Sequence, residues 1–234
     1  MAFDQNGSTW LNQYHAMNSN WGSMRIDAET STILNPILIV LLVPIFSKFV
    51  YPTIESRFGR FRLLDRMLVG MFLSVIAFIV VGIIQIEVDK TKDAGFLIYN
   101  EKGMRWDCPE DPVLAQRCVH GAWQILPYFI ITCGEVLFSI SGLNFTYEEV
   151  GSRMKASAAS LWLLMVAIGN LLMVPLASLY EIVGDMTFFF ICAAVIFVAN
   201  LTYFFIRRFY VYKEDRDTTS SVVVSEIVEI IESK

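Results

Sequence analysis

Residues 123–147 read WQILPYFIITCGEVLFSISGLNFTY, and Glu135 is the only charged side chain among them. A helix needs about 20 mostly apolar residues to cross a bilayer, so this stretch is long enough to span. A charge near the centre of such a helix costs roughly 2.5 to 3.5 kcal/mol, and it normally faces a bundle interior or a water-filled cavity. The stretch therefore predicts a membrane helix, and Glu135 is the first candidate site residue.

The composition of the whole chain indicates an integral membrane protein. Hydrophobic residues make up 55% of it, charged residues only 18%, and the mean hydropathy is +0.53. The formal charge of -5 is spread along the chain, without the clustered basic face that nucleic-acid binding requires. Nucleic acid is therefore not an expected partner.

Five segments are predicted to span, which makes this an all-α membrane protein with five complete transmembrane helices and a partial one. Residues 1–29 are expected to hold the end of a truncated helix and an outer loop. Residues 30–207 form the transmembrane bundle with a longer outer loop at 87–121, and residues 208–234 form a tail. The predicted spans are residues 30–51, 64–86, 123–147, 156–180 and 186–206.

The distribution of Lys and Arg predicts the orientation, because basic residues near helix ends favour the cytoplasmic side. They gather after the first, third and last predicted spans, three regions that fall on one side of the membrane. We therefore predict a cytoplasmic C-terminus, with an acidic and apolar tail at 221–234 that forms a short amphipathic helix or folds only against a partner. The basic residues that set this orientation include Lys48, Arg57, Arg60, Arg62, Arg66, Arg153, Lys155, Arg207, Arg208, Lys213 and Arg216.

Glu135 has two interpretations. The helical period places Thr132, Ser139 and Gly142 on its side of the helix, which predicts a polar lining and close helix approach. On the functional interpretation, the acid faces a cavity and binds a cationic ligand group or titrates with a coupling proton. On the structural one, it pairs with a basic residue on a neighbouring helix.

Two further residues carry weaker signals. Asn35 and Pro36 open the first predicted span, where Asn ordinarily caps free N–H groups and Pro suits the first turn. Trp162 shares a helix face with Val166 and Gly169, but an aromatic residue in a spanning helix is more often lipid-facing or core than ligand-binding. Pattern alone does not make either residue a site.

Cys108 and Cys118 lie in the predicted outer loop, in an oxidising compartment, and we expect them to form a disulfide. His15 and His120 are expected to be surface histidines, because no metal-ligand spacing joins them to these cysteines. No metal site or cofactor is predicted. The chain has no Gly-rich phosphate loop, HExxH motif or nucleophile elbow, so it is not expected to be an enzyme.

Several sequence blocks, in order, resemble the C-terminal half of proton-coupled oligopeptide transporters, a family of the major facilitator superfamily. The resemblance covers nearly the whole chain. The blocks are FDQNGSTW (3–10), LNPILIVLLVPIF (34–46), VGIIQIEVDKT (81–91), QILPYFIITCGEVLFSISGLNFTY (124–147), MKAS (154–157) and LWLLMVAIGN (161–170).

This resemblance implies a fold, an activity and a set of site residues. The fold would be the C-terminal six-helix bundle of a transporter that works by alternating access, using H⁺ as the coupling ion. The family's glutamate in the GEV block corresponds to Glu135 and is associated with the amino terminus of the bound peptide. Its asparagine at the start of the eighth helix corresponds to Asn35, which would contact the peptide backbone. Its tryptophan in the WLL block corresponds to Trp162, in a side-chain pocket.

The resemblance also implies a missing partner, the N-terminal bundle with its ExxER motif and basic residues. We therefore expect the C-terminal half of a di- and tripeptide:proton symporter of the plasma membrane, a fragment that does not transport alone. The alternative from another class is a non-transporting membrane protein that binds or modulates a full-length transporter.

Overall fold

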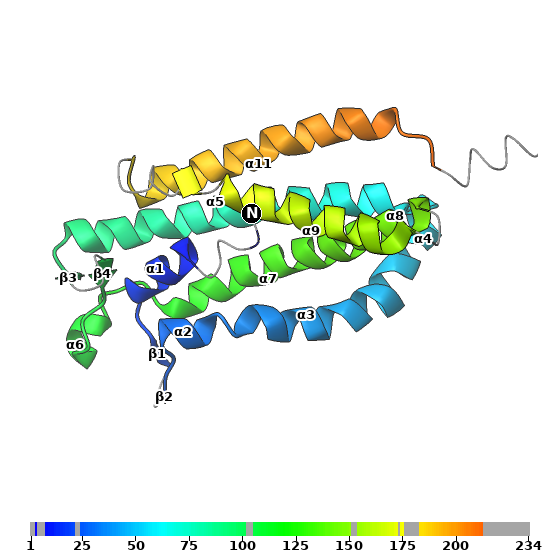
Figure 1. Cartoon of the computed structure of the whole chain (residues 1–234). Helices are drawn as coiled ribbons and strands as arrows, with labels where there is room; N and C mark the ends of the chain where they lie inside the picture. The colour runs from blue at the N-terminus through cyan, green and yellow to red at the C-terminus, as the bar shows by residue number, and fades with distance from the viewer. Residues whose placement is uncertain are drawn as a thin grey trace, which may run out of the picture.

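Long helices run side by side through the computed structural model, and the short strands gather at one end of them (Figure 1). The structure describes residues 3, 8–21, 24–101, 105–150, 154–172, 174–175 and 183–212. Within these ranges α4 (Tyr51–Phe58) and α8 (Ser141–Glu149) mark the end opposite the strands.

The centre of the bundle is α5 (Leu63–Asp93), which packs against α7 (Ile125–Glu135) and α11 (Asp185–Arg208). The first contact is close because glycines meet there: a Cβ on Gly70 would lie 2.6 Å from the carbonyl oxygen of Gly134. Small residues at a crossing let membrane helices approach and pack. The apolar core beside it includes Phe78, Ile131 and Phe188, none of which is exposed.

The first spanning run is assembled from α2 (Ala28–Ser31), α3 (Leu34–Ile45), a π-helical turn η2 (Phe46–Val50) and α4. Pro44 removes a backbone donor from α3, and the wider π-helical turn follows it. A second π-helical turn, η4 (Val136–Ile140), joins α7 to α8 directly after Glu135.

The strand end of the bundle holds the short helix α1 (Thr9–His15), which buried glutamines tie to the rest. Gln13 donates to the Val81 carbonyl at 3.1 Å and to the Gln85 side chain at 2.9 Å, and Gln124 donates to the Trp10 carbonyl at 2.8 Å. The other elements here are the antiparallel pairs β1 (Asn20–Trp21) with β2 (Met24–Arg25) and β3 (Ile98–Asn100) with β4 (Arg105–Asp107), the helix α6 (Pro112–Ala115) and the 3₁₀ turn η3 (Gly121–Gln124).

Four helical runs in the described residues are long and apolar enough to cross a membrane: Ala28–Arg57, Leu63–Asp93, Gly121–Glu149 and Asp185–Arg208. They match the first, second, third and fifth predicted spans. For the fourth, the structure shows α9 (Lys155–Leu171), while residue 173 and residues 176–182 lie outside the described part. The predicted number of five spans therefore stays a prediction.

In the structure, the outer loop begins later than predicted. The helix α5 continues to Asp93, into the segment 87–121, because polar side chains pair along it: Gln85 donates to Asp89 and Lys90 donates to Glu87. Cys108 and Cys118 are joined in a disulfide, with their Cα atoms 6.3 Å apart. Residues 213–234, which include the predicted amphipathic helix, lie outside the described residues.

Candidate functional site in the helix bundle

Glu135 ends α7 and is half-buried beside α3. The side-chain amide of Asn35 donates to Glu135 Oε2 across 3.2 Å. An amide donor stabilises the carboxylate without neutralising its charge, since hydrogen bonds to charged groups contribute about 1.5 to 3 kcal/mol. Two residues 100 positions apart in the chain, both predicted as site residues, are therefore in direct contact.

Thr132 fixes the orientation of Asn35. Because the Asn35 nitrogen faces the carboxylate, its oxygen faces Thr132, whose hydroxyl donates to it at 2.5 Å. The same hydroxyl lies 2.7 Å from the Tyr128 carbonyl, so its single proton has two acceptors within reach. Thr132 thus orients Asn35, and Asn35 holds Glu135.

A cavity of about 380 Å³ opens beside Glu135, within the usual size range of small-molecule sites. Its walls come from four parts of the bundle, α5, the α7–η4 run, α9 and α11, together with Phe3. Asn35 is not among the lining residues, so it supports Glu135 from behind. The other lining residues are Met71, Ser74, Phe138, Ser139, Trp162, Met165, Val166, Gly169, Val195, Ile196 and Ala199.

Trp162 lies across Gly142, where a Cβ would overlap the indole ring. The ring also lies 5.8 Å from that of Phe138, which is 5.9 Å from the ring of Phe3. These three aromatic side chains form an apolar wall in the cavity that Glu135 also lines. Only a glycine at position 142 allows the indole to lie so close to α8.

The structure brings together all three residues predicted as the binding site: Asn35 contacts Glu135, and Trp162 shares its cavity. The predicted face of Trp162, Val166 and Gly169 lines that cavity, as does Ser139. Phe138 was missed, although its spacing from Glu135 could have suggested it. Phe3 was quoted only as part of a sequence block.

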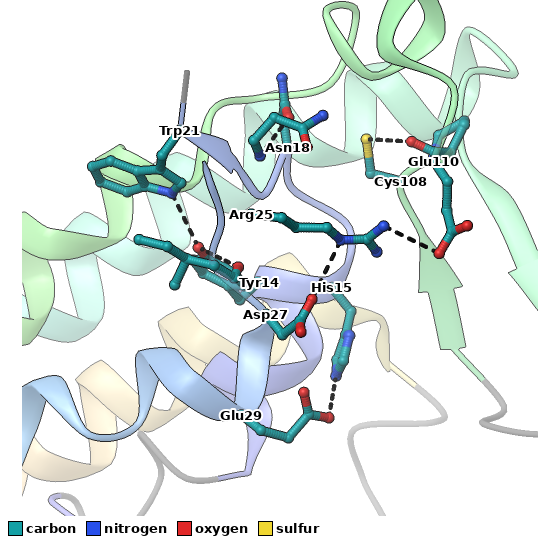
Figure 2. A network of polar contacts seen from close by, with 12 residues as sticks. Tyr14, His15, Asn18, Trp21, Arg25, Asp27, Glu29, Cys108 and Glu110 are labelled. Atoms are coloured by element: carbon teal, nitrogen blue, oxygen red, sulfur yellow. Dashed lines mark hydrogen bonds and ion pairs between the residues drawn. The ribbon is translucent and has the colours of Figure 1, made fainter. Parts of the chain in front are cut away.

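A separate polar cluster lies between α1, α2 and β4 at the strand end (Figure 2). Arg25 forms ion pairs with Asp27 at 3.3 Å and Glu110 at 3.1 Å, and His15 Nε2 lies 3.7 Å from Glu29. The two Arg25 pairs are exposed, and exposed pairs contribute at most about 1 kcal/mol each, so they add little to the stability of the fold.

His15 differs from the surface prediction, whereas His120 is only half-buried. The side chain of His15 is only 13% exposed, and burial lowers its pKa, with Arg105 as a second cause. His120 accepts from the Ala122 amide at 3.1 Å, and its Nε2 lies 3.0 Å from the Asn20 carbonyl oxygen. In the described part of the chain, no cluster of His, Cys, Asp or Glu is arranged to hold a metal ion.

Comparison with known proteins identifies the family to which this chain belongs. The family model described as PTR2: POT family matches residues 1–187. The chain belongs to the POT family. Members of this family are transporters, and the chain is therefore an integral, multi-pass membrane protein.

Among curated relatives, solute carrier family 15 member 1 of Homo sapiens is 23% identical over 376 aligned residues, covering 90% of this chain and 53% of the relative. The Mus musculus protein of the same name is 45% identical over 89 residues, 38% of this chain and 13% of that protein. The chain thus spans about half the length of the human relative that it matches.

Two solved structures share the fold. The in meso crystal structure of the POT family transporter PepTSo has a TM-score of 0.69 at 30% identity, covering 88% of this chain and 38% of that one. An auto-inhibited POT family peptide transporter has a TM-score of 0.67 at 29% identity, covering 91% and 39%.

Proposed function

We propose that this chain forms the C-terminal half of a proton-coupled di- and tripeptide symporter, with Glu135 binding the amino terminus of the peptide. The observation that carries the proposal is the Asn35–Glu135 hydrogen bond at the wall of the cavity. Membership of a family whose named relatives include peptide transporters supports it.

Electrostatics explain why a carboxylate suits this place. An acid in mid-membrane is costly unless it is partnered, so a peptide ammonium that enters the cavity removes part of that cost. The Asn35 donor holds the carboxylate in position at the wall of the cavity, where a cationic ligand group could reach it. In a low-dielectric cavity, a charge-assisted contact of this kind is stronger than a neutral one.

The aromatic wall suits the side chains of the peptide. Trp162 and Phe138 present apolar surface without a fixed pattern of donors and acceptors. A wall of this kind discriminates weakly between apolar groups, by about 1 to 3 kcal/mol per methylene at most. We therefore expect recognition of the peptide amino terminus together with tolerance of varied side chains.

Alternating access requires a second wall. We propose that the family's N-terminal bundle supplies it, together with the groups that bind the peptide carboxylate and carry the proton. Peptide binding to Glu135 would then favour the conformation in which both walls contact the ligand. The protein is proposed to act in the plasma membrane with a cytoplasmic C-terminus. The family match favours this function over the non-transporting modulator.

Uptake by a fusion protein tests the proposal. The chain is joined to the N-terminal bundle of a family member, and proton-driven uptake of a labelled dipeptide is measured in proteoliposomes. We expect Glu135→Gln to abolish most uptake, while Glu148→Gln, which changes an exposed carboxylate on α8, leaves it intact. Normal uptake by the Glu135→Gln fusion would remove the role assigned to this residue.

A further inference from the structure

Ser139 lines the same cavity as Glu135, on the continuous helical run from α7 into η4. Ser74 carries the other hydroxyl among the described lining residues, but it is 1% exposed and already donates to the Gly70 carbonyl at 3.1 Å. Ser139 is half-buried and forms no hydrogen bond with any residue that the structure describes. Its hydroxyl therefore keeps its donor and its acceptor capacity for a ligand in the cavity.

The π-helical turn η4 explains why this hydroxyl has no backbone partner. In an α-helix, the hydroxyl of Ser or Thr ordinarily bonds to the carbonyl of the residue four positions earlier. A π-helical turn is wider than an α-helical one, so the Glu135 carbonyl is displaced from the place where Ser139 would meet it. Three hydroxyls on α-helical turns of the same bundle make the ordinary bond: Thr146 to Gly142, Ser160 to Ala156 and Thr202 to Val198.

A primary ammonium group needs more than one acceptor in such a cavity. It carries three N–H donors, and a buried donor without an acceptor costs free energy. The aromatic wall offers none, because Phe138 has no polar atom and the Trp162 indole nitrogen is only a donor. Two N–H···O contacts of ordinary length let one ammonium bridge oxygens up to about 6 Å apart. Ser139 Oγ is therefore suited to accept an N–H that Glu135 does not.

We propose that Ser139 is a specificity-determining residue, whose Oγ accepts one N–H of the ligand ammonium while Glu135 accepts another. This inference rests on the proposed function, because it requires the peptide amino terminus to bind at Glu135. Glu135 then recognises the positive charge of the amino terminus, and Ser139 recognises its N–H donors. The cavity therefore selects peptides with an unsubstituted amino terminus over those with a methylated amino nitrogen, although methylation leaves the positive charge in place.

Methylated peptides separate these two roles. Isothermal titration calorimetry measures binding of alanyl-alanine and its N,N-dimethyl form to the fusion protein. Both ligands are cations, but the dimethyl form keeps a single N–H. We expect the wild type to favour the primary amine and Ser139→Val to reduce this preference roughly tenfold, since one hydrogen bond to a charged group is lost. Ser139→Thr has the shape of the Val variant and keeps the hydroxyl, so it should retain the preference.

The control is Ser160→Val on the exposed surface of α9, where the hydroxyl donates to the Ala156 carbonyl at 2.9 Å. It should leave the preference unchanged. Equal preferences in the Val and Thr variants at position 139 would overturn the role of Ser139, because side-chain shape would then explain the selection. Ser139→Ala replaces the Val variant if that protein does not fold.

A second ligand pair keeps this inference apart from the proposed function. Ser139→Val should still favour free alanyl-alanine over its N-acetylated form, because Glu135 remains to recognise the charge. Glu135→Gln should lose that preference. If Glu135→Gln keeps it, the proposed function fails and this inference fails with it. If Glu135→Gln loses it but Ser139→Val distinguishes the primary and dimethylated amines as the wild type does, only the role of Ser139 is overturned.

Discussion

The helices α5 and α7 are packed on both sides, whereas α3 and α9 expose most of their surface. In the spans Leu63–Asp93 and Gly121–Glu149, half of the most apolar 18-residue stretch is buried, whereas only 11% of that stretch is buried in the span Ala28–Arg57. No residue of α9 is buried. Glu135 belongs to the packed pair, while Asn35 and Trp162 belong to the exposed pair.

This difference separates two roles within one site. Packing through Gly70 and Gly134 fixes the helix that carries the carboxylate. Its partners lie on helices with few contacts, and such helices open or shift at lower free-energy cost. We infer that the acid is a fixed anchor and that α3 and α9 adjust to the ligand or to a covering bundle.

Substituting two tryptophans, one in each region, should give the largest difference in stability. Trp10 is fully buried against Phe78 and Tyr128, so Trp10→Ala should cost about 3 to 5 kcal/mol of unfolding free energy. Trp162 is half-buried on α9, and Trp162→Ala should cost about 1 kcal/mol while changing the preference for peptide side chains. Thermal unfolding in detergent measures the stability of both variants. Equal losses of unfolding free energy would contradict the difference in packing between the two regions.

The glycine crossing offers the next contrast. Gly134→Leu places a side chain against the Gly70 carbonyl oxygen and should destabilise the protein by about 3 kcal/mol. Ala167→Leu adds the same group on the exposed helix α9 and should be neutral. The same unfolding assay applies, and a Gly134→Leu protein as stable as the wild type would show that this crossing does not fix α7.

Removing the support of Glu135 should have an intermediate effect on function. Asn35→Ala should weaken dipeptide binding by the fusion protein roughly tenfold, because one charged hydrogen bond is lost. It should add little in a Glu135→Gln background, since the two residues act together. Asn170→Ala on the exposed surface of α9 is the control. Additive losses in the double variant would mean that Asn35 acts independently.

The smallest expected effect is a pH dependence at the strand end. Burial lowers the pKa of His15 in the folded protein, so the unfolded chain binds this proton first as the pH falls through the ordinary histidine range near about 6.5. Folding stability should therefore decline on acidification through that range and below it. His15→Gln should reduce the decline, and an unchanged pH profile in the unfolding assay would contradict this assignment.

The apolar runs were enough to locate four spans, because length and hydropathy decide which segments enter a bilayer. Helix periodicity also placed Trp162, Val166 and Gly169 on one face, since α9 is regular. Polar pairs that continue α5 to Asp93 were not recognised, because charged residues near a predicted membrane boundary were interpreted as loop.

The contacts between helices could not be predicted in the same way. The crossing of Gly134 with Gly70 depends on how two helices pack, which the pattern of either helix alone does not show. The Asn35–Thr132 hydrogen bond likewise joins distant segments. The π-helical turn after Glu135 alters the helical period there, so a regular wheel does not describe η4.

The most direct test of the central claim compares a free dipeptide with its N-acetylated form. Binding to the wild-type fusion protein should strongly favour the free ammonium, and Glu135→Gln should reduce that preference to near equality while Glu148→Gln preserves it. A Glu135→Gln fusion that still distinguishes the two ligands as the wild type does would contradict the assignment of Glu135 as the peptide anchor.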